Sequence, residues 1–201
     1  MKENRKGDIF MSLVNTPSGN RLHIGIFGKR NSGKSSLLNA ITGQEIALVS
    51  EVKGTTTDPV SKAMEIHPIG PCLLIDTAGF DDTGDLGNMR IEKTKAVLDK
   101  TDVAVVVFSD MQMELETQWI AMLRQRKIPI LAVVNQVDRI EQVQEIKRQI
   151  EQRFSLTPLL VSAKEKTGIS QMKHEILRLM PPDFEAQSLT GSLVQPEDVV
   201  L

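Results

Sequence analysis

The sequence predicts an α/β fold in which a mostly parallel sheet of about six strands carries helices on both faces. Short apolar runs alternate with amphipathic stretches from about residue 21 to residue 181. One run, residues 103–108 (Val-Ala-Val-Val-Val-Phe), is apolar throughout. Such a strand belongs in the middle of a parallel sheet that helices cover on both sides. Strands that alternate with helices form right-handed βαβ units.

The elements follow in chain order. We expect strands over residues 22–27, 60–66 (an edge strand), 71–75, 103–108, 128–134 and 158–161. Their apolar residues are continuous or alternate with a period of two. We expect helices over residues 34–41, 89–98, 114–125, 140–154 and 169–179. The first of these ends at Thr42-Gly43, which is typical of a helix C-terminus.

The chain of 201 residues fits one ordinary α/β domain with short extensions. Residues 1–20 are polar and are expected to form an N-terminal arm. Residues 21–181 are expected to form the folded domain. Residues 182–201 lose the strand–helix rhythm after Pro181-Pro182. We interpret them as a linker and the start of a truncated next domain.

Composition limits the partners and the compartment. The net charge is -2 and there is no polybasic run, so we expect neither nucleic acid nor a membrane as a partner. The single cysteine, Cys72, lies in an apolar run and is expected to be a buried hydrophobic residue. One cysteine cannot form an internal disulfide or an iron–sulfur site, which suits a reducing compartment. The sequence therefore predicts a cytoplasmic protein.

Residues 28–35 (Gly-Lys-Arg-Asn-Ser-Gly-Lys-Ser) match G-x-x-x-x-G-K-S between a predicted strand and a predicted helix. The glycines let the backbone curl around phosphate oxygens, and the helix N-terminus adds partial positive charge. In this arrangement Lys34 reaches the β- and γ-phosphates, and the Ser35 hydroxyl is a ligand for Mg²⁺. The pattern predicts a P-loop NTPase fold. Its candidate nucleotide contacts are Asn31, Ser32, Gly33, Lys34, Ser35 and Ser36.

The segment Asp76-Thr77-Ala78-Gly79 follows the predicted strand 71–75. A carboxylate at the carboxyl end of a strand beside the P-loop strand is placed to bind Mg²⁺, directly or through a water molecule. The N–H of Gly79 is placed to contact the γ-phosphate, so this loop can sense whether that phosphate is present. The segment therefore predicts Asp76 as a magnesium ligand and Gly79 as a phosphate sensor.

Two more segments predict the base. Asn135-Gln136-Val137-Asp138 follows the strand 128–134, and the Asp138 carboxylate can accept from both the ring N–H and the exocyclic amine of guanine. Adenine lacks that donor pair and would leave the charge unpaired. Ser162-Ala163-Lys164 follows the strand 158–161, and its backbone can hold the guanine carbonyl oxygen. The four segments together predict GTP or GDP as the ligand.

The order of these segments, with Gly54-Thr55-Thr56-Thr57-Asp58, resembles the Era and MnmE branch of the translation-factor-like GTPases. The resemblance implies that Thr56 binds Mg²⁺ and senses the γ-phosphate. Lys34, Thr56 and Gly79 are then the catalytic residues. Members activated by K⁺ carry an asparagine at the position of Asn31, so the resemblance also implies a potassium ligand there. The ion would supply the positive charge that other GTPases obtain from an arginine finger.

Longer stretches resemble the HydF family of FeFe-hydrogenase maturation GTPases. They are Asn15-Thr16-Pro17, Arg21-Leu22-His23-Ile24, residues 54–60 (Gly-Thr-Thr-Thr-Asp-Pro-Val) and residues 75–82 (Ile-Asp-Thr-Ala-Gly-Phe-Asp-Asp). In that family the GTPase domain precedes a dimerisation domain and a domain that binds a 4Fe–4S cluster. The resemblance implies that the full-length protein works with other hydrogenase maturases and with FeFe-hydrogenase. We expect no iron–sulfur cluster in this chain.

Two departures bear on activity. Gln136 stands where the base-selecting segment usually has lysine, and we expect weaker nucleotide affinity with intact guanine preference. Phe80 stands where Ras-like enzymes have the water-orienting glutamine, so hydrolysis should be slow. Either one of Asp81, Asp82 and Asp85 positions the water, or all three are solvated charges.

Three functions remain open. The first is a slow, potassium-stimulated GTPase switch for hydrogenase maturation. The second is a GTP- or GDP-binding module in which hydrolysis is incidental. The third is a ribosome- or tRNA-linked GTPase of the Era or MnmE kind, which the near-neutral charge disfavours.

Overall fold

The structure is a computed structural model that describes residues 21–43, 61–76, 94–182 and 184. Six strands form one sheet in the order β2-β3-β1-β4-β5-β6. Their bounds are β1 (Leu22–Gly28), β2 (Ser61–Ile66), β3 (Gly70–Asp76), β4 (Val103–Phe108), β5 (Ile130–Val134) and β6 (Leu159–Leu160). Neighbouring strands are parallel except for the antiparallel pair β2 and β3. The predicted fold class is confirmed.

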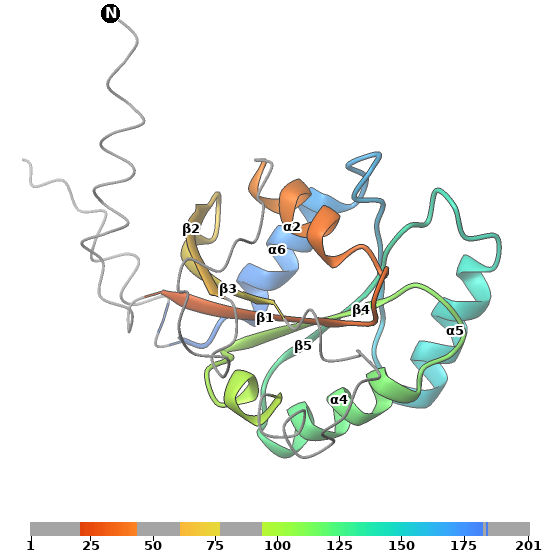
Figure 1. Cartoon of the computed structure of the whole chain (residues 1–201), viewed down its shortest axis with the longest axis horizontal. Coiled ribbons are helices and arrows are strands. Elements are labelled where there is room, and N and C mark those ends of the chain that lie inside the picture. Colours follow the sequence, from red (N-terminus) through yellow and green to blue (C-terminus); the bar gives the residue numbers. More distant parts are fainter. Residues whose placement is uncertain (1–20, 44–60, 77–93, 183, 185–201) are drawn as a thin grey trace, which may run out of the picture.

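Helices cover both faces of this sheet, as Figure 1 shows. The helices are α2 (Lys34–Thr42), α4 (Glu114–Gln125), α5 (Val143–Phe154) and α6 (Ile169–Leu179). Helices α2 and α6 share one apolar cluster with the sheet. Helices α4 and α5 share the other, together with the helical residues 94–98.

Strand β4 divides the core into these two layers. Val103, Val105 and Val107 face the layer of α2 and α6. Ala104, Val106 and Phe108 face the layer of α4 and α5. Because successive side chains of a strand point to opposite faces, a strand that is apolar at every position contributes to both layers. All six residues are buried, which is the position predicted for this run.

The structure corrects three predicted boundaries. The strand expected from residue 128 begins at Ile130, because the N–H of Ile128 donates to the Leu123 carbonyl (3.1 Å) and closes α4. The helix expected from residue 140 begins at Val143, after turns that start at Gln136. The strand expected over residues 158–161 has only two residues. In the first two cases a turn held by its own backbone hydrogen bonds takes residues whose apolar character suggested a longer element.

Cys72 is fully buried, as predicted. Burial raises the pKa of its thiol to about 12, so the thiol stays protonated and inert near neutral pH. Across the ranges that the structure describes, no helix is both long and apolar enough to cross a membrane.

We expect Gly25→Ala to lower the free energy of unfolding by about 1–3 kcal/mol, the usual cost of overpacking a core. A Cβ atom at Gly25 would lie 2.6 Å from Thr101 Oγ1 and 2.9 Å from the Phe27 ring. Thr101 cannot move freely, because its hydroxyl donates to the Val97 carbonyl (2.7 Å). Urea unfolding measures the change. Gln118→Ala on the exposed side of α4 is the control, and an equal loss in both variants would contradict the steric explanation.

Candidate functional site

The predicted site segments follow strands whose carboxyl ends meet at one edge of the sheet. The P-loop follows β1, and Asp76 ends β3 in register with Ile26 of β1. Asn135 follows β5, and its N–H donates to the carbonyl of Phe108 at the end of β4 (3.0 Å). Open α/β sheets bind their ligands at this edge. The structure thus gathers segments that lie more than 100 residues apart in the chain.

The P-loop turns sharply between β1 and α2. Asn31 and Gly33 both have left-handed backbone conformations, with φ angles of 62° and 83°. A Cβ atom at Gly33 would lie only 2.4 Å from Asn135 Nδ2. Glycine is therefore required at this position by its backbone conformation and also by the loop packed against it.

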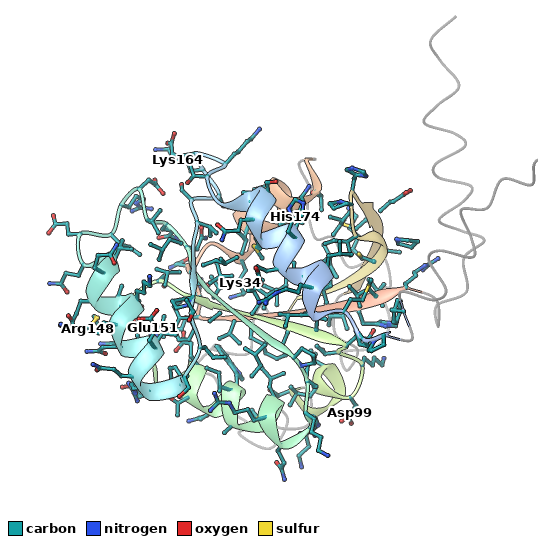
Figure 2. All side chains as sticks on the ribbon, turned by 180° about the vertical axis from the view of Figure 1, so that it is seen from behind. Lys34, Asp99, Arg148, Glu151, Lys164 and His174 are labelled. Carbon is teal, nitrogen blue, oxygen red and sulfur yellow. The ribbon has the colours of Figure 1, made fainter. Side chains whose placement is uncertain are left out.

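Lys34 is 7% exposed and begins α2. Its Nζ donates to the carbonyls of Gly28 and Lys29, the second at 2.7 Å. Figure 2 shows Lys34 inside the molecule. The Ser32 hydroxyl of the same loop is buried and has no hydrogen-bond partner within the part of the chain that the structure describes. A buried cation and an unsatisfied hydroxyl in one loop fit an anionic ligand.

Asn135 ties three loops together. Its Nδ2 donates to the Ser32 carbonyl of the P-loop (3.0 Å). Its Oδ1 accepts from the N–H of Ala163, in the loop after β6 (3.2 Å). Because Asn135 is 1% exposed, these bonds are shielded from competing water. The sequence predicted Asn135 as a nucleotide contact, and the structure shows in addition that it organises the site.

Asp138 and Ser162 form the predicted base-selecting corner. The Ser162 hydroxyl donates to Asp138 Oδ1 (2.6 Å) and accepts from the N–H of Glu165 (3.1 Å). The hydrogen bond from Ser162 lowers the pKa of Asp138 below its ordinary value. The carboxylate is therefore held ionised and oriented, yet its residue is exposed at the surface, where a ligand could reach it.

Gln136 reaches the P-loop, which sequence reasoning missed. Its Nε2 donates to the Asn31 carbonyl (2.8 Å), and both residues have positive φ angles. The positive φ of Gln136 directs its side chain across the gap between the two loops. A sequence pattern carries no signal for this contact, because it depends on backbone conformation at both ends. The expected loss of nucleotide affinity stays a prediction.

A second cluster that sequence reasoning missed surrounds Lys29. Its Nζ lies 2.6 Å from Asp110 Oδ1 and 4.0 Å from Glu116 Oε2. The Glu116 side chain is 2% exposed. Burial raises the pKa of Glu116 to about 7, although its own backbone N–H and the charge of Lys29 act in the opposite direction.

The remaining predicted residues divide into two groups. Ser35 and Ser36 lie exposed in the first turn of α2, and Lys164 lies exposed in the loop before α6, where its ammonium pairs with Glu165 (3.6 Å). Figure 2 shows the Lys164 side chain directed outward, so only its backbone could line the site. Thr56, Gly79 and Phe80 lie outside the described residues, as do Asp81, Asp82 and Asp85.

The fold and the site define a P-loop GTPase domain. The sequence profile of the 50S ribosome-binding GTPases matches residues 23–136, which is more than half of the chain. The chain belongs to this family.

Its relatives are longer GTPases. It is 33% identical over 172 residues to GTPase Der of Wolinella succinogenes, a match that covers 79% of this chain and 36% of that protein. It is 32% identical over 190 residues to tRNA modification GTPase MnmE of Flavobacterium johnsoniae, covering 90% of this chain and 39% of that protein. The chain thus spans well under half the length of these relatives.

Among solved structures, the fold matches Era in complex with MgGDPNP and nucleotides 1506–1542 of 16S ribosomal RNA, with a TM-score of 0.62 and 22% identity. That match covers 79% of this chain and 56% of the Era chain. The predicted resemblance to the Era and MnmE class is confirmed. The finer resemblance to the hydrogenase-maturation family rests on the sequence stretches alone.

We expect Glu116→Gln to raise the melting temperature at about pH 8, with a gain that disappears near about pH 4.5. The pKa of Glu116 rises from an ordinary value of 4.5 to about 7 in the fold, so the fold favours the neutral form. The contribution of this group to stability is therefore present below pH 4.5 and lost as the pH rises through 7. Lys29 opposes this shift, while Asp110 and Glu114 add to it.

Thermal unfolding followed by circular dichroism between about pH 4.5 and 8 measures this effect. Glu65→Gln, an exposed carboxylate on β2 that does not contribute to the pKa shift of Glu116, is the control. A gain in Glu116→Gln that does not vary with pH would contradict the assignment.

Proposed function

We propose that this GTPase domain is the nucleotide-dependent switch of a larger protein. The observation that carries the proposal is the side chain of Asn135, which bonds the P-loop and the loop after β6 at once. Guanine recognition at Asp138 and phosphate binding at the P-loop then belong to one bonded unit. A ligand that spans both is a guanine nucleotide with at least a β-phosphate.

In this proposal Asp138 selects guanine, and the backbone of Ser162, Ala163 and Lys164 holds the guanine carbonyl oxygen. The low pKa of Asp138 keeps its carboxylate ready to accept the two guanine donors at neutral pH. Gly33 and Lys34 hold the phosphates, together with the helix N-terminus of α2.

Mg²⁺ fits the residues at the carboxyl edge. Ser35 lies exposed at the first turn of α2, and Asp76 ends the strand beside β1. Hydroxyl and carboxylate oxygens are the ligands that Mg²⁺ prefers, and we assign Thr56 as the third ligand from its sequence segment. When bound, Mg²⁺ would supply positive charge at the β- and γ-phosphates. Thr56 and Gly79 then report the γ-phosphate, and Lys34 stabilises it during slow hydrolysis.

We expect faster GTP turnover in KCl than in NaCl at matched ionic strength, because the resemblance assigns Asn31, an exposed residue of the P-loop, as a potassium ligand. Phosphate release by the purified domain with Mg²⁺ measures this. Asn31→Ala should remove the difference between the two salts. Equal turnover of the unaltered chain in both salts would exclude potassium activation.

We expect Asp138→Asn to shift base preference from guanine toward xanthine, whose C2 carbonyl needs a donor where guanine offers an amine. The dissociation constants of GDP and xanthosine diphosphate, measured by competition against a fluorescent nucleotide, test the shift. Glu141→Gln, an exposed carboxylate in the turn before α5, is the control. Unchanged preference in Asp138→Asn would place guanine recognition elsewhere.

The attached domains decide what the switch controls. The family and the Era complex with ribosomal RNA favour a ribosome- or tRNA-linked role. The stretches at residues 54–60 and 75–82 favour hydrogenase maturation in the cytoplasm as the second candidate, with dimerisation and 4Fe–4S domains following residues 182–201.

Experiments on the full-length protein loaded with a non-hydrolysable GTP analogue distinguish the two candidate roles. Co-sedimentation with ribosomal subunits or retention of tRNA would favour the first role. Activation of apo FeFe-hydrogenase in the presence of the other maturases would favour the second.

A further inference from the structure

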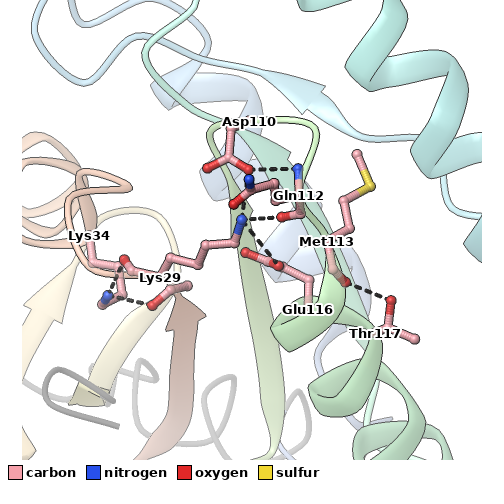
Figure 3. Close-up of polar contacts among 8 residues, drawn as sticks. Lys29, Lys34, Asp110, Gln112, Met113, Glu116 and Thr117 are labelled. Carbon is pink, nitrogen blue, oxygen red and sulfur yellow. Dashed lines mark hydrogen bonds and ion pairs between the residues drawn. The ribbon is translucent and has the colours of Figure 1, made fainter. Parts of the chain in front are cut away.

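The Lys29 side chain leaves the P-loop and ends at the start of α4, as Figure 3 shows. Its ammonium donates to Asp110 Oδ1 (2.6 Å) and to the Gln112 carbonyl, and it lies 4.0 Å from Glu116 Oε2. Two of these oxygens belong to the loop between β4 and α4, and the third belongs to the first turn of α4. One cation therefore joins the second residue of the P-loop to a separate element.

The segment that contacts the Lys29 ammonium, residues 110–116, is held by its own hydrogen bonds. Asp110 Oδ1 also accepts the N–H of Gln112 (2.8 Å), which closes the loop around the same oxygen. The Thr117 hydroxyl donates to the Met113 carbonyl (2.6 Å) in the next turn. Glu116 is nearly fully buried, and its Oε2 has no hydrogen-bond partner in the ranges that the structure describes. Lys29 supplies the nearby positive charge that this buried carboxylate needs.

The backbone of Lys29 makes the other half of the connection. Its carbonyl accepts from Lys34 Nζ at 2.7 Å, and the preceding Gly28 carbonyl accepts from the same ammonium. Lys29 thus binds α4 through its side chain while its carbonyl orients the lysine assigned to the phosphates (Figure 3).

We propose that Lys29 is a positioning residue for phosphate binding: by anchoring the P-loop to the start of α4, it fixes the carbonyls that hold the Lys34 ammonium. The proposal rests on the phosphate-binding role assigned to Lys34 above. It extends that role to a side chain whose ammonium contacts residues 110–116. It also makes the segment of residues 110–116 part of the machinery that sets nucleotide affinity.

A solvent-exposed ion pair contributes little to stability and would not fix the position of the loop. Lys29 differs in two respects. Its side chain is 18% exposed, so water screens its contacts weakly. Its partners lie in the loop before α4 and in the first turn of α4, and they include a backbone carbonyl, so the ammonium is held in one place.

The test compares Lys29→Met, Lys34→Ala and the double variant in their binding of GTP, GDP and GMP. Lys34 serves the β- and γ-phosphates, so GMP binding does not depend on it. Lys29→Met should weaken GDP and GTP binding by about tenfold, the loss expected for one charge-assisted hydrogen bond. It should leave GMP binding within about twofold. In the Lys34→Ala background it should add nothing, because it acts through Lys34.

Three further variants complete the design. Lys29→Arg should restore GDP affinity, because it keeps the charge and reaches the same oxygens. Asp110→Asn, at a half-exposed position, removes the negative charge but keeps one acceptor oxygen. It should show a smaller loss of the same kind, and it provides a test even if Lys29→Met unfolds. Lys147→Met removes an ion-paired lysine of α5 (3.9 Å from Glu151) and should change none of these affinities.

Equal loss of GMP, GDP and GTP binding in Lys29→Met and Asp110→Asn would overturn the proposal, since it would indicate general loosening of the fold. The proposal would also be overturned if GDP binding were unchanged in both of these variants while Lys34→Ala lost GDP binding. If Lys34→Ala itself binds GDP normally, the assigned role of Lys34 fails, and this inference fails with it.

Discussion

The site depends on the packing of the Asn135 side chain against the P-loop. Its carboxamide donates to the Ser32 carbonyl and accepts from the Ala163 N–H, and it leaves no space for a Cβ atom at Gly33. Asn135 can hold this position because it follows β5, which β4 and β6 flank in a parallel register. The order of strands in the sheet therefore brings together the segments that we propose to bind base and phosphate.

The pKa values of two carboxylates in and near the site follow from their surroundings in the fold. Asp138 is exposed but kept ionised by the Ser162 hydroxyl, which suits a group that must meet a ligand. Glu116 is buried with a raised pKa, which suits a group that contacts protein alone. The two carboxylates differ in surroundings, and this difference separates the residue proposed to recognise guanine from a structural one.

The P-loop is held from both sides. Gln136 donates to the Asn31 carbonyl on the side of the base, and Lys29 reaches Asp110 on the side of α4. Loops that bind phosphate need a defined backbone, because their N–H groups must converge on one ligand. In this chain, polar side chains provide that definition in addition to the glycine residues.

The amino-acid sequence by itself determined the fold class, the order of the four site segments along the chain, and the choice of Lys34, Asn135 and Asp138 as candidates. It could do so because apolar periodicity and short motifs are local properties of the chain. Only the tertiary structure decided where β5 begins, that Gln136 reaches Asn31, and that Lys29 meets Asp110 and Glu116. The contacts of Gln136 and Lys29 join residues about 80 to 105 positions apart. They depend on backbone conformation and on strand order, which no local pattern encodes.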